Sequence, residues 1–491
     1  MGQNIEQVSF SDAQFTHFTE ALHEQLDALK HIIAEPNFGN APLKFGAELE
    51  MYLINDQGEI SLSNQQLIGD LNDPQYQPEL NRYNLELNLE PVDLAGTPFS
   101  ALQRQMKAKT DHLEVIAKNR RVNVLPIGIL PTLEKQHLNV DFMTDLPRYH
   151  CLSKYLYKAR GDAFKINING DESLSENIDD ISAEGANTSF QVHLMIEPSK
   201  FTDVYNAAQL TLPLVTAVSA NSAIFLGKRL WDETRIALFK QSIDIRKPDN
   251  TPWQEQPRVN FGFGWLHGSP WHLYSQAVCL FEPIMPVTSN KPTTGLLPEL
   301  NELSLHLGTT WPWNRPVYCN QGNGHIRLEF RAIPAGPTSL DMLANAAFAI
   351  GLATGVANNI DEYTSVLPFQ YAEYNFYRAA QSGINAKVLW PFSHKYHVGE
   401  VEISSVITKL LPVAKQGLLQ LNIEEAEADK FLSIIAARLA SGITGAIWQK
   451  QTLAELTKKM TNHDACKALT LLYLENCRSC KPVHEWERIW K

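Results

Sequence analysis

The stretch KFGAELEMYLIN, Lys44 to Asn55, is a largely apolar run that carries two glutamates. Glu48 and Glu50 alternate with Leu49 and Met51, so an extended chain places both carboxylates on one face of a sheet. Two acids side by side on one face repel each other unless a counter-charge lies nearby. By itself, such a run is more often a solvated sheet face than half of a metal site.

Three further alternating segments carry acidic or imidazole side chains. They are NLELNLEP with Glu86, SFQVHLMI with His193 and IRLEFRAI with Glu329, and Glu79 stands seven residues before Glu86. If these strands are neighbours in one sheet, their carboxylates meet on a single face and repel strongly unless cations hold them together. Carboxylate oxygens with one imidazole suit Mg²⁺ or Mn²⁺. Because Mg²⁺ takes phosphate oxygens as further ligands, the pattern suggests ATP chemistry.

Arginines accompany these strands. Arg327 and Arg331 flank Glu329 at two-residue spacing and share its face, whereas Arg315 lies in WPWNRP and Arg235 in WDETRIALF. A guanidinium group is the natural partner of a carboxylate or a phosphoryl group. Metal-binding acids beside phosphate-binding arginines are what phosphoryl transfer to a carboxylate requires. Each element alone also fits a structural histidine or a simple ion pair, so the prediction depends on their recurrence in four strands.

Composition limits the class of protein. The chain has 491 residues, of which 44% are hydrophobic and 20% charged, and this is ordinary for a globular protein with a large core. A net charge of −12 argues against nucleic-acid and membrane partners. The polar first thirty residues do not resemble a secretory signal, and the six cysteines are sparse, so we expect a reducing cytoplasm. The apolar stretch 206–227 is expected to be a buried core helix.

Periodicity predicts the order of the elements. Strands are expected at 44–54, 85–89, 187–197 and 325–334 and in NVLPIGILPTL, and helices at 11–34, 99–119, from Thr202 and at 339–360. Strand pairs followed by long helices indicate an α+β fold with a mostly antiparallel sheet. Only helical patterns follow Val401. We therefore predict an N-terminal helix and linker (1–42), a catalytic domain (43–398) and a helical C-terminal segment (399–491).

Several segments together resemble glutamate–cysteine ligase family 2, carboxylate–amine ligases related in fold to glutamine synthetase. They are FGAELEMYLI, YNLELNLEP, NTSFQVHLMI with LPLVTAVSANSAIFLG, WDETRIALF and WNRPVYCNQGNGHIRLEFRAIPAGPTSLDMLANAAF, in the family's order from about Leu43 to Ala357. LWDETRIALF, GTTWPWNRP and AIPAGPTSLDMLANAAF resemble its bacterial branch. The resemblance implies a glutamine-synthetase-like antiparallel sheet flanked by long helices.

The resemblance also implies two metal sites. The ligands of one would be Glu48, His193 and Glu329, and those of the other Glu50, Glu86 and, by its spacing, Glu79. Glu90 competes with Glu86 for the second site, and this choice is open.

Roles for other residues follow from the same resemblance. Arg331 is similar to the arginine that contacts the transferring phosphoryl group, and Arg235 to the one that grips the amino-acid substrate. Arg315 is also expected in the site. The residues expected to bind substrate or ATP are Arg327, Asn88 and Asn221.

The implied activity is an ATP- and Mg²⁺-dependent ligation, with Mn²⁺ as an alternative ion. It joins a carboxylate, expected to be the γ-carboxyl of glutamate, to cysteine or another amino compound through an acyl phosphate. No pocket for cysteine is recognisable, so the amine is open. Alternatives are a guanidino or amine phosphotransferase of the same fold and an inactive family member that binds nucleotide or amino acid. Small molecules are the expected partners, with the C-terminal helices as a candidate homodimer surface.

A cysteine cluster near the end of the chain is a separate candidate site. Cys477 and Cys480 form a Cys–Arg–Ser–Cys pair, with Cys466 and His463 before it and His484 after it. Zinc favours such ligands. The irregular spacing fits thiols on helix faces better.

Overall fold

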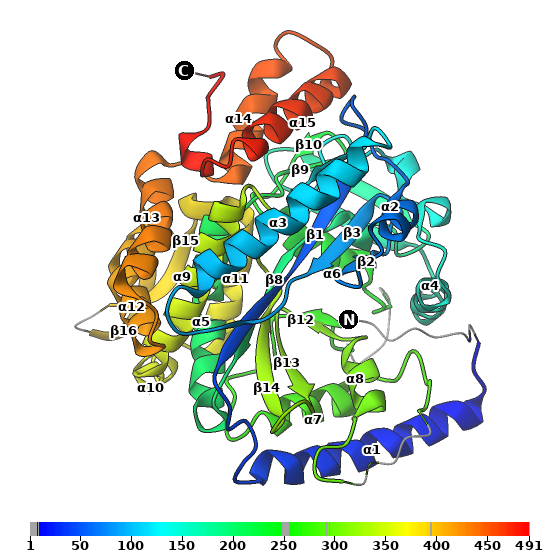
Figure 1. The fold of residues 1–491 in the computed structure, drawn as a ribbon, viewed down its shortest axis with the longest axis vertical. Coiled ribbons are helices and arrows are strands. Elements are labelled where there is room, and N and C mark those ends of the chain that lie inside the picture. Colours follow the sequence, from blue (N-terminus) through cyan, green and yellow to red (C-terminus); the bar gives the residue numbers. More distant parts are fainter. Residues whose placement is uncertain are drawn as a thin grey trace.

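A central antiparallel sheet organises the chain (Figure 1). The computed structural model describes residues 7, 9–247, 255–289, 293, 295–392 and 395–490. The sheet has eight strands, in the order β13-β14-β8-β1-β3-β2, and β4 and β5 also pair with β1. The strands are Lys44–Ile54 (β1), Tyr76–Pro78 (β2), Asn84–Asn88 (β3), Val92–Asp93 (β4), Asn123–Leu125 (β5), Phe190–Met195 (β8), Asn314–Cys319 (β13) and His325–Phe330 (β14).

Smaller strand pairs surround this sheet. They are Phe164–Asn169 (β6) with Ser173–Ile178 (β7), Ile224–Phe225 (β9) with Lys228–Arg229 (β10), Val259–Asn260 (β11) with Trp311–Pro312 (β12), and Lys387–Phe392 (β15) with Lys395–Glu402 (β16). Only the β11–β12 pair is parallel.

Long helices pack beside the sheet and form much of the core. The α-helices are Asp12–Ala34 (α1), Asn64–Leu71 (α2), Pro98–Lys118 (α3), Pro147–Arg160 (α4), Phe201–Ser219 (α5), Thr234–Ser242 (α6), Trp271–Leu280 (α7), Asn301–Leu307 (α8), Ser339–Ala357 (α9), Ile360–Thr364 (α10), Phe369–Ser382 (α11), Ile403–Gln420 (α12), Glu425–Ser441 (α13), Gly445–Leu456 (α14) and Asn462–Arg478 (α15). In Figure 1, α1 lies at one end of the molecule and α14 and α15 at the other. Helix α9 packs against α5 on one side and against α12 on another. Most residues of α5 and α9 are therefore buried, which agrees with the apolar sequence of both helices.

The predicted fold class is confirmed. Strand β1 has the predicted bounds, and β3, β8 and β14 begin and end within four residues of the predicted bounds. Only Asn123–Leu125 of NVLPIGILPTL is a strand, because Pro126 and Pro131 cannot donate to a ladder. Strand β13 was not predicted, since it contains Pro316. It lies at the edge of the sheet, where proline is tolerated.

The C-terminal segment is helical as predicted, from α12 to α15. The predicted boundary at 398/399 falls inside the β15–β16 hairpin, where Val398 pairs with Pro391 and Gly399 with Trp390. Helix α12 packs against α9 of the preceding segment. The division into three parts remains a prediction.

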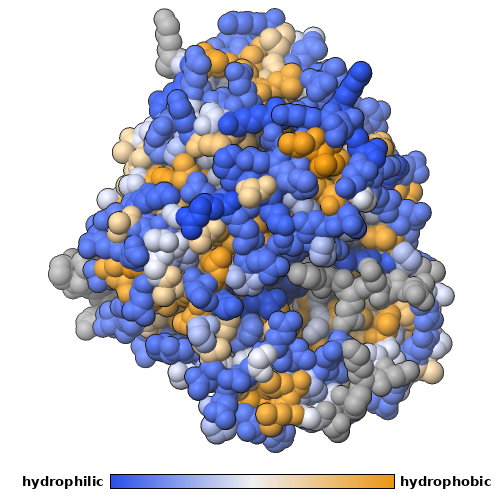
Figure 2. All heavy atoms as spheres, in the orientation of Figure 1, coloured by the Kyte–Doolittle hydropathy of each residue, from blue (hydrophilic) through white to orange (hydrophobic). Residues whose placement is uncertain are grey.

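Two helical segments are long and apolar enough to cross a membrane, and both are largely covered by other elements. Ser339–Ala357 is α9, of which 83% is buried inside the molecule, and Glu425–Leu456 spans α13 and α14 and is 56% buried. Helices of a protein core meet the same criteria of length and apolarity. Figure 2 shows hydrophilic residues over most of one face, with hydrophobic residues in small separate groups.

Glycines allow α9 and α12 to approach closely. A Cβ atom added to Gly417 of α12 would overlap the carbonyl oxygen of Gly351 and the nitrogen of Gly355, both on α9. Both of these atoms belong to the backbone, so neither can move away without shifting a helix. The contact therefore requires glycine at position 417.

The substitution Gly417→Ala should destabilise the chain by about 1–3 kcal/mol, because the methyl group forces α9 and α12 apart. Urea unfolding followed by circular dichroism measures the change. Gly69→Ala is the matched control, since Gly69 lies in α2 with nothing within 4 Å of the added atom. This control should be neutral or stabilising. Equal midpoints for Gly417→Ala and the wild type would contradict the packing argument.

Candidate active site

The register of the sheet brings the predicted residues to one face. His193 on β8 lies opposite Gly46 on β1 and Glu329 on β14, and Glu329 lies opposite Arg315 on β13. The next rows pair Gln191 and Asn88 with Glu48, and Glu86 with Glu50. Residues opposite each other in an antiparallel pair point to the same side. The sheet therefore places its acids and arginines on one surface.

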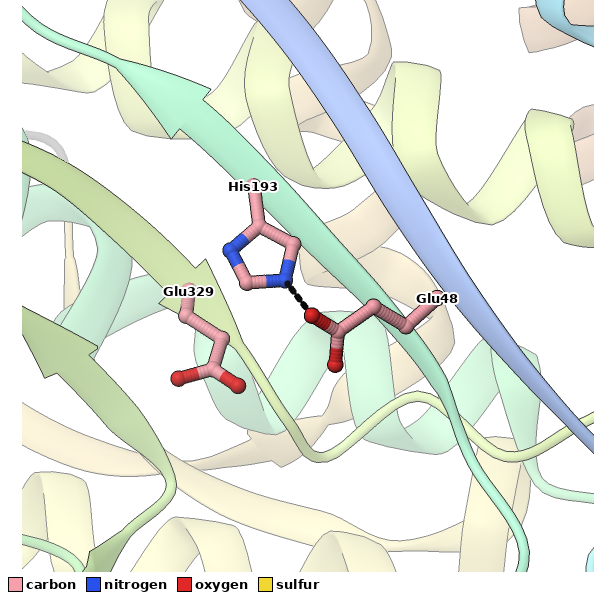
Figure 3. Close-up of side chains that lie close together, drawn as sticks. All are labelled: Glu48, His193 and Glu329. Atoms are coloured by element: carbon pink, nitrogen blue, oxygen red, sulfur yellow. Dashed lines mark ion pairs between the residues drawn. The ribbon is translucent and has the colours of Figure 1, made fainter. Parts of the chain in front are cut away.

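The first set of side chains consists of Glu48, His193 and Glu329. One ligand atom from each lies within 4.8 Å of the others. Figure 3 shows the two carboxyl groups and the imidazole turned toward a common space from three strands. His193 Nε2 lies 3.1 Å from Glu48 Oε1.

Two arginines hold the Glu329 carboxylate in this set. Arg315 contacts it with Nε at 2.5 Å and with Nη2 at 3.1 Å, and Arg331 Nη1 lies 2.6 Å from Oε1. Burial opposes ionisation, but Arg315 and Arg331 together hold the pKa of Glu329 well below its usual value.

The pKa of Glu48 is also low. Burial would raise it, but the neighbouring His193 lowers the pKa of Glu48 to about 2. Glu48 and Glu329 are therefore both ionised near neutral pH, and the two arginines supply the opposite charge beside Glu329.

The second set consists of Glu50, Glu79 and Glu86, whose carboxylate oxygens also lie within 4.8 Å of one another. Glu50 accepts hydrogen bonds from Ser189 N at 2.7 Å and Gln191 Nε2 at 2.8 Å. Both of these partners of Glu50 are neutral, whereas two arginines hold Glu329 in the first set.

Repulsion dominates the second set. Burial and the charges of Glu50 and Glu86 raise the pKa of Glu79 well above its usual value. Burial and the charge of Glu48 raise the pKa of Glu86 to about 7. Burial also raises the pKa of Glu50, although Arg235 and Ser189 oppose it. Three carboxylates this close together are stable only when some of them are protonated or when a cation binds between them.

These donor sets fit hard divalent cations. Both sets offer carboxylate oxygens, and the first set also offers one imidazole nitrogen. Mg²⁺ and Mn²⁺ prefer ligands of this kind. The second set fits most directly, because a bound dication would remove its uncompensated charge. Within the described part of the chain, these are the two groups of acidic, histidine or cysteine side chains with this spacing.

A cavity of about 1100 Å³ opens beside the first set. Glu48, His193, Arg327 and Asn88 all contribute to its wall. Its size lies at the upper end of the range for small-molecule sites. Glu50 is not among the lining residues, so the cavity reaches the first set and stops before the second.

Several residues predicted to bind substrate or phosphate lie at this face. Arg327 Nε donates to His193 Nδ1 at 3.1 Å. Arg331 Nη1 donates to Gln191 Oε1 at 2.6 Å, and Asn88 Nδ2 donates to Glu86 Oε1 at 2.6 Å. The structure thus brings together these residues, Arg315 and both predicted ligand sets; their functional roles remain predictions.

Arg235 was expected on or near the strands of the site, but it lies on a helix. It belongs to helix α6, is 3% exposed, and its Nη1 lies 3.1 Å from Glu233 Oε1. Its guanidinium also donates to the carbonyl oxygens of Arg331 and Ala332, just after β14. Arg235 therefore supports the backbone that carries Arg331, and its contact with a substrate remains a prediction.

Asn221 requires a correction. It is fully buried, and its Nδ2 donates to Ala335 O at 2.7 Å and to Tyr473 Oη at 2.8 Å. Its Oδ1 accepts from Gln449 Nε2 at 2.9 Å. Because the whole amide group serves these internal bonds, the predicted substrate contact of Asn221 is not what the structure shows.

The competition for the second set has a geometric answer. Glu79 and Glu86 lie with Glu50, whereas Glu90 is exposed and lines the cavity.

The cysteine cluster does not assemble: all six cysteines are free thiols, and Cys477 Sγ contacts Pro337 O at 3.1 Å.

Other residues near the site were not predicted. Gln191 lies two residues before His193, so its place on the same face followed from strand alternation. Glu184, in the short helix Glu184–Ala186 (η3), and Arg148, at the start of α4, lie in segments whose positions depend on packing. Both interact electrostatically with Glu79.

Residues 44–265 match the family model of glutamate-cysteine ligase family 2. These residues belong to glutamate-cysteine ligase family 2. The match agrees with the predicted family and its ligase class over this segment, which is slightly less than half of the chain. The matched segment includes five of the six candidate ligands, and Glu329 lies beyond it.

One solved structure of low sequence identity has a similar fold, and two others align with lower scores. The glutamate–cysteine ligase of Francisella tularensis, in complex with AMP, aligns with a TM-score of 0.53 at 11% identity over 90% of each chain. A bifunctional glutathione synthetase from Pasteurella multocida gives a TM-score of 0.45 at 11% identity, covering 94% of this chain and 55% of that one. The ligase PafA with the ubiquitin-like protein Pup gives 0.41 at 8% identity, covering 89% and 72%. No curated protein sequence matches the chain.

The substitution Glu86→Gln should stabilise the metal-free chain at neutral pH. Folded Glu86 keeps its proton up to about pH 7, whereas unfolded Glu86 loses it near 4.5, so wild-type stability falls as pH rises through this window. Glutamine does not ionise. The variant's free energy of unfolding should exceed that of the wild type by up to about 3 kcal/mol above pH 7 and match it below pH 4.5. Urea unfolding in chelator checks this, and parallel pH profiles would contradict it.

The same variant should lose metal affinity. Glu86→Gln removes a charged oxygen from the second set, so Mn²⁺ binding there should weaken roughly 10-fold or more. Titration followed by electron paramagnetic resonance counts the bound ions. Glu90→Gln is the matched control and should bind as many ions as the wild type. A loss of one ion in Glu90→Gln instead would reverse the assignment.

Proposed function

We propose that the chain joins the γ-carboxyl of glutamate to an amine at the expense of ATP, with Mg²⁺ or Mn²⁺ at the two carboxylate sets. The observation that carries this proposal is the single sheet face that holds both sets, Arg315 and Arg331, and whose first set borders a cavity of about 1100 Å³ through Glu48 and His193. This arrangement suits phosphoryl transfer between a nucleotide and a carboxylate. Glutamate as the acyl substrate follows from the family name.

In this proposal the cavity holds the nucleotide. Arg327 lines the cavity and can turn from His193 toward a phosphate. Its neighbours on the face, Glu48 and His193, would hold one cation. The Francisella tularensis enzyme of similar fold was solved with AMP, which supports a nucleotide as a substrate of this chain.

Arg331 and Arg315 stand at the point of transfer. Their side chains are 15% and 16% exposed and rest on Glu329, so they are already oriented before substrates arrive. Such preorganised donors stabilise charge that develops in a transition state. Cations in the two sets, when bound, would neutralise the phosphates.

The chemistry has two steps. A carboxylate oxygen of glutamate attacks the γ-phosphorus, and the bond from that phosphorus to ADP breaks. The amine nitrogen then attacks the acyl carbon, the bond from carbon to the phosphate oxygen breaks, and phosphate leaves with the electron pair. The nitrogen releases its surplus protons to the solvent. Burial of the face excludes water, which would otherwise hydrolyse the acyl phosphate.

We further infer small-molecule substrates and a cytoplasmic location, which the free state of all six cysteines supports. A homodimer through the C-terminal helices remains a prediction.

The test is an amine screen. Purified protein with ATP, MgCl₂ and glutamate should release phosphate only when a suitable amine is added, and mass spectrometry should find the amide. Glu48→Gln and Arg331→Ala should each lower kcat by about 10²-fold or more. Glu48→Gln should keep the wild-type melting temperature, whereas Arg331→Ala should lower it because the buried Glu329 loses a partner. Glu425→Gln is the control, since it only breaks a surface pair with Lys415.

Other outcomes separate the alternatives. A phosphorylated small molecule without an amide would identify a phosphotransferase. Nucleotide-dependent thermal stabilisation without turnover would identify an inactive binding protein. Full activity of Glu48→Gln would refute the assigned site.

A further inference from the structure

The side chain of Gln191 connects the two carboxylate sets by direct hydrogen bonds. Its Nε2 donates to Glu50 Oε1 of the second set at 2.8 Å, and its Oε1 accepts from Arg331 Nη1 at 2.6 Å. The same nitrogen of Arg331 also donates to Glu329 Oε1 of the first set at 2.6 Å. Gln191 therefore lies between an acid expected to bind a cation and the arginine expected to contact the phosphoryl group.

Only one orientation of this amide suits both neighbours. A guanidinium group can only donate and a carboxylate can only accept, so the oxygen of Gln191 faces Arg331 and its nitrogen faces Glu50. Turning the amide over would place N–H groups against the arginine and an oxygen atom against the carboxylate. The two hydrogen bonds therefore fix each other, and a movement of either neighbour breaks one of them.

Strand β8 holds this arrangement in place. Gln191 is 4% exposed and lies opposite Glu48 in the register. Ser189, two residues earlier on the chain, donates its backbone N–H to Glu50 Oε2 at 2.7 Å. Each oxygen of Glu50 thus accepts one hydrogen bond from this part of the chain and keeps a lone pair for a cation.

A neutral amide is the suitable side chain between these two groups. An acid in its place would repel Glu50 and would add a second negative charge beside Arg331, which already faces Glu329. An apolar side chain would leave Arg331 and Glu50 each without one hydrogen-bond partner. Glutamine orients the arginine without neutralising it, so the positive charge stays available to a phosphoryl group.

We propose that Gln191 is a positioning residue of the ligation reaction, which holds Arg331 in the orientation needed for phosphoryl transfer and joins that orientation to the carboxylate of Glu50. Gln191 itself contacts no reacting atom. When Glu50 holds a cation, its carboxylate is fixed in place, and Gln191 transmits this fixed position to Arg331. The inference rests on the proposed ligase function.

The first test is a double-mutant cycle of Gln191→Met and Arg331→Ala. Methionine is unbranched like glutamine but makes neither hydrogen bond. We expect Gln191→Met to lower kcat roughly 10-fold or more, with the KM for ATP and glutamate within about twofold, because Arg331 acts in the transition state. In the Arg331→Ala background the same substitution should lower kcat by less than about twofold, since the arginine to be positioned is gone.

A second measurement does not depend on turnover. Mn²⁺ titration followed by electron paramagnetic resonance, without ATP or glutamate, reports the affinity of the carboxylate sets. Gln191→Met should weaken Mn²⁺ binding at the second set roughly 10-fold, because Glu50 loses a donor that orients it. The first set contains no direct partner of Gln191 other than through Arg331, so its Mn²⁺ affinity should change less.

Gln241→Met is the matched control. Gln241 on α6 also donates one hydrogen bond and accepts one, both with the backbone of Asn167 on β6. Its substitution removes the same kind of amide outside the site, so kcat, both KM values and Mn²⁺ binding should match the wild type.

Gln191→Glu serves if Gln191→Met unfolds, which a melting curve shows. Glutamate keeps the shape of glutamine but presents an oxygen to Glu50 and a negative charge to Arg331. We therefore expect kcat to fall roughly 10-fold or more again, with the KM for ATP within about twofold.

Three results would overturn the inference: an unchanged kcat in the Gln191 variants, a full further loss of kcat in the Arg331→Ala background, or wild-type Mn²⁺ binding in Gln191→Met. A raised KM for glutamate with an unchanged kcat would make Gln191 a substrate-binding residue instead. If the wild type itself forms no amide, the proposed function fails, whereas the Mn²⁺ titration still tests the link between Gln191 and the second set.

Discussion

Mutual repulsion among buried carboxylates on one sheet face is the constraint on which the rest of the structure depends. Antiparallel pairing has a period of two, so alternate acids on β1 meet those of β3 and β14 without any special turn. Such crowding is unfavourable unless cations, protons or guanidinium groups compensate it. A large part of this sheet face therefore consists of groups that bind positive charge.

The two sets meet this constraint in different ways. Around Glu329, Arg315 and Arg331 already supply positive charge, so the first set is ionised before any cation binds. The set around Glu50 has only neutral donors and keeps protons instead. A cation entering the first set must compete with arginines, whereas one entering the second set displaces protons. Phosphate oxygens could draw the arginines away and so couple nucleotide and cation binding at the first set.

Strand alternation predicted that the acids of β1, β3 and β14 and His193 of β8 would share a face, whereas the division into two ligand sets and the place of Glu79 followed from the family resemblance. Which strands pair was not encoded in that alternation and came from the family resemblance. Asn221 was misassigned because its partner Tyr473 lies 252 residues away, and no local pattern reveals such a contact. Glu184 and Arg148 were missed because loop packing, and not periodicity, brings them to the sheet.

The face has a direction, and this direction separates charges that would otherwise neutralise one another. Arg327 lines the cavity beside Glu48 and His193, whereas Glu50, Glu79 and Glu86 lie beyond the cavity wall. The set that gains most from a cation is therefore the one that the cavity does not line, whereas the set beside the cavity is the one in which arginines already hold a carboxylate.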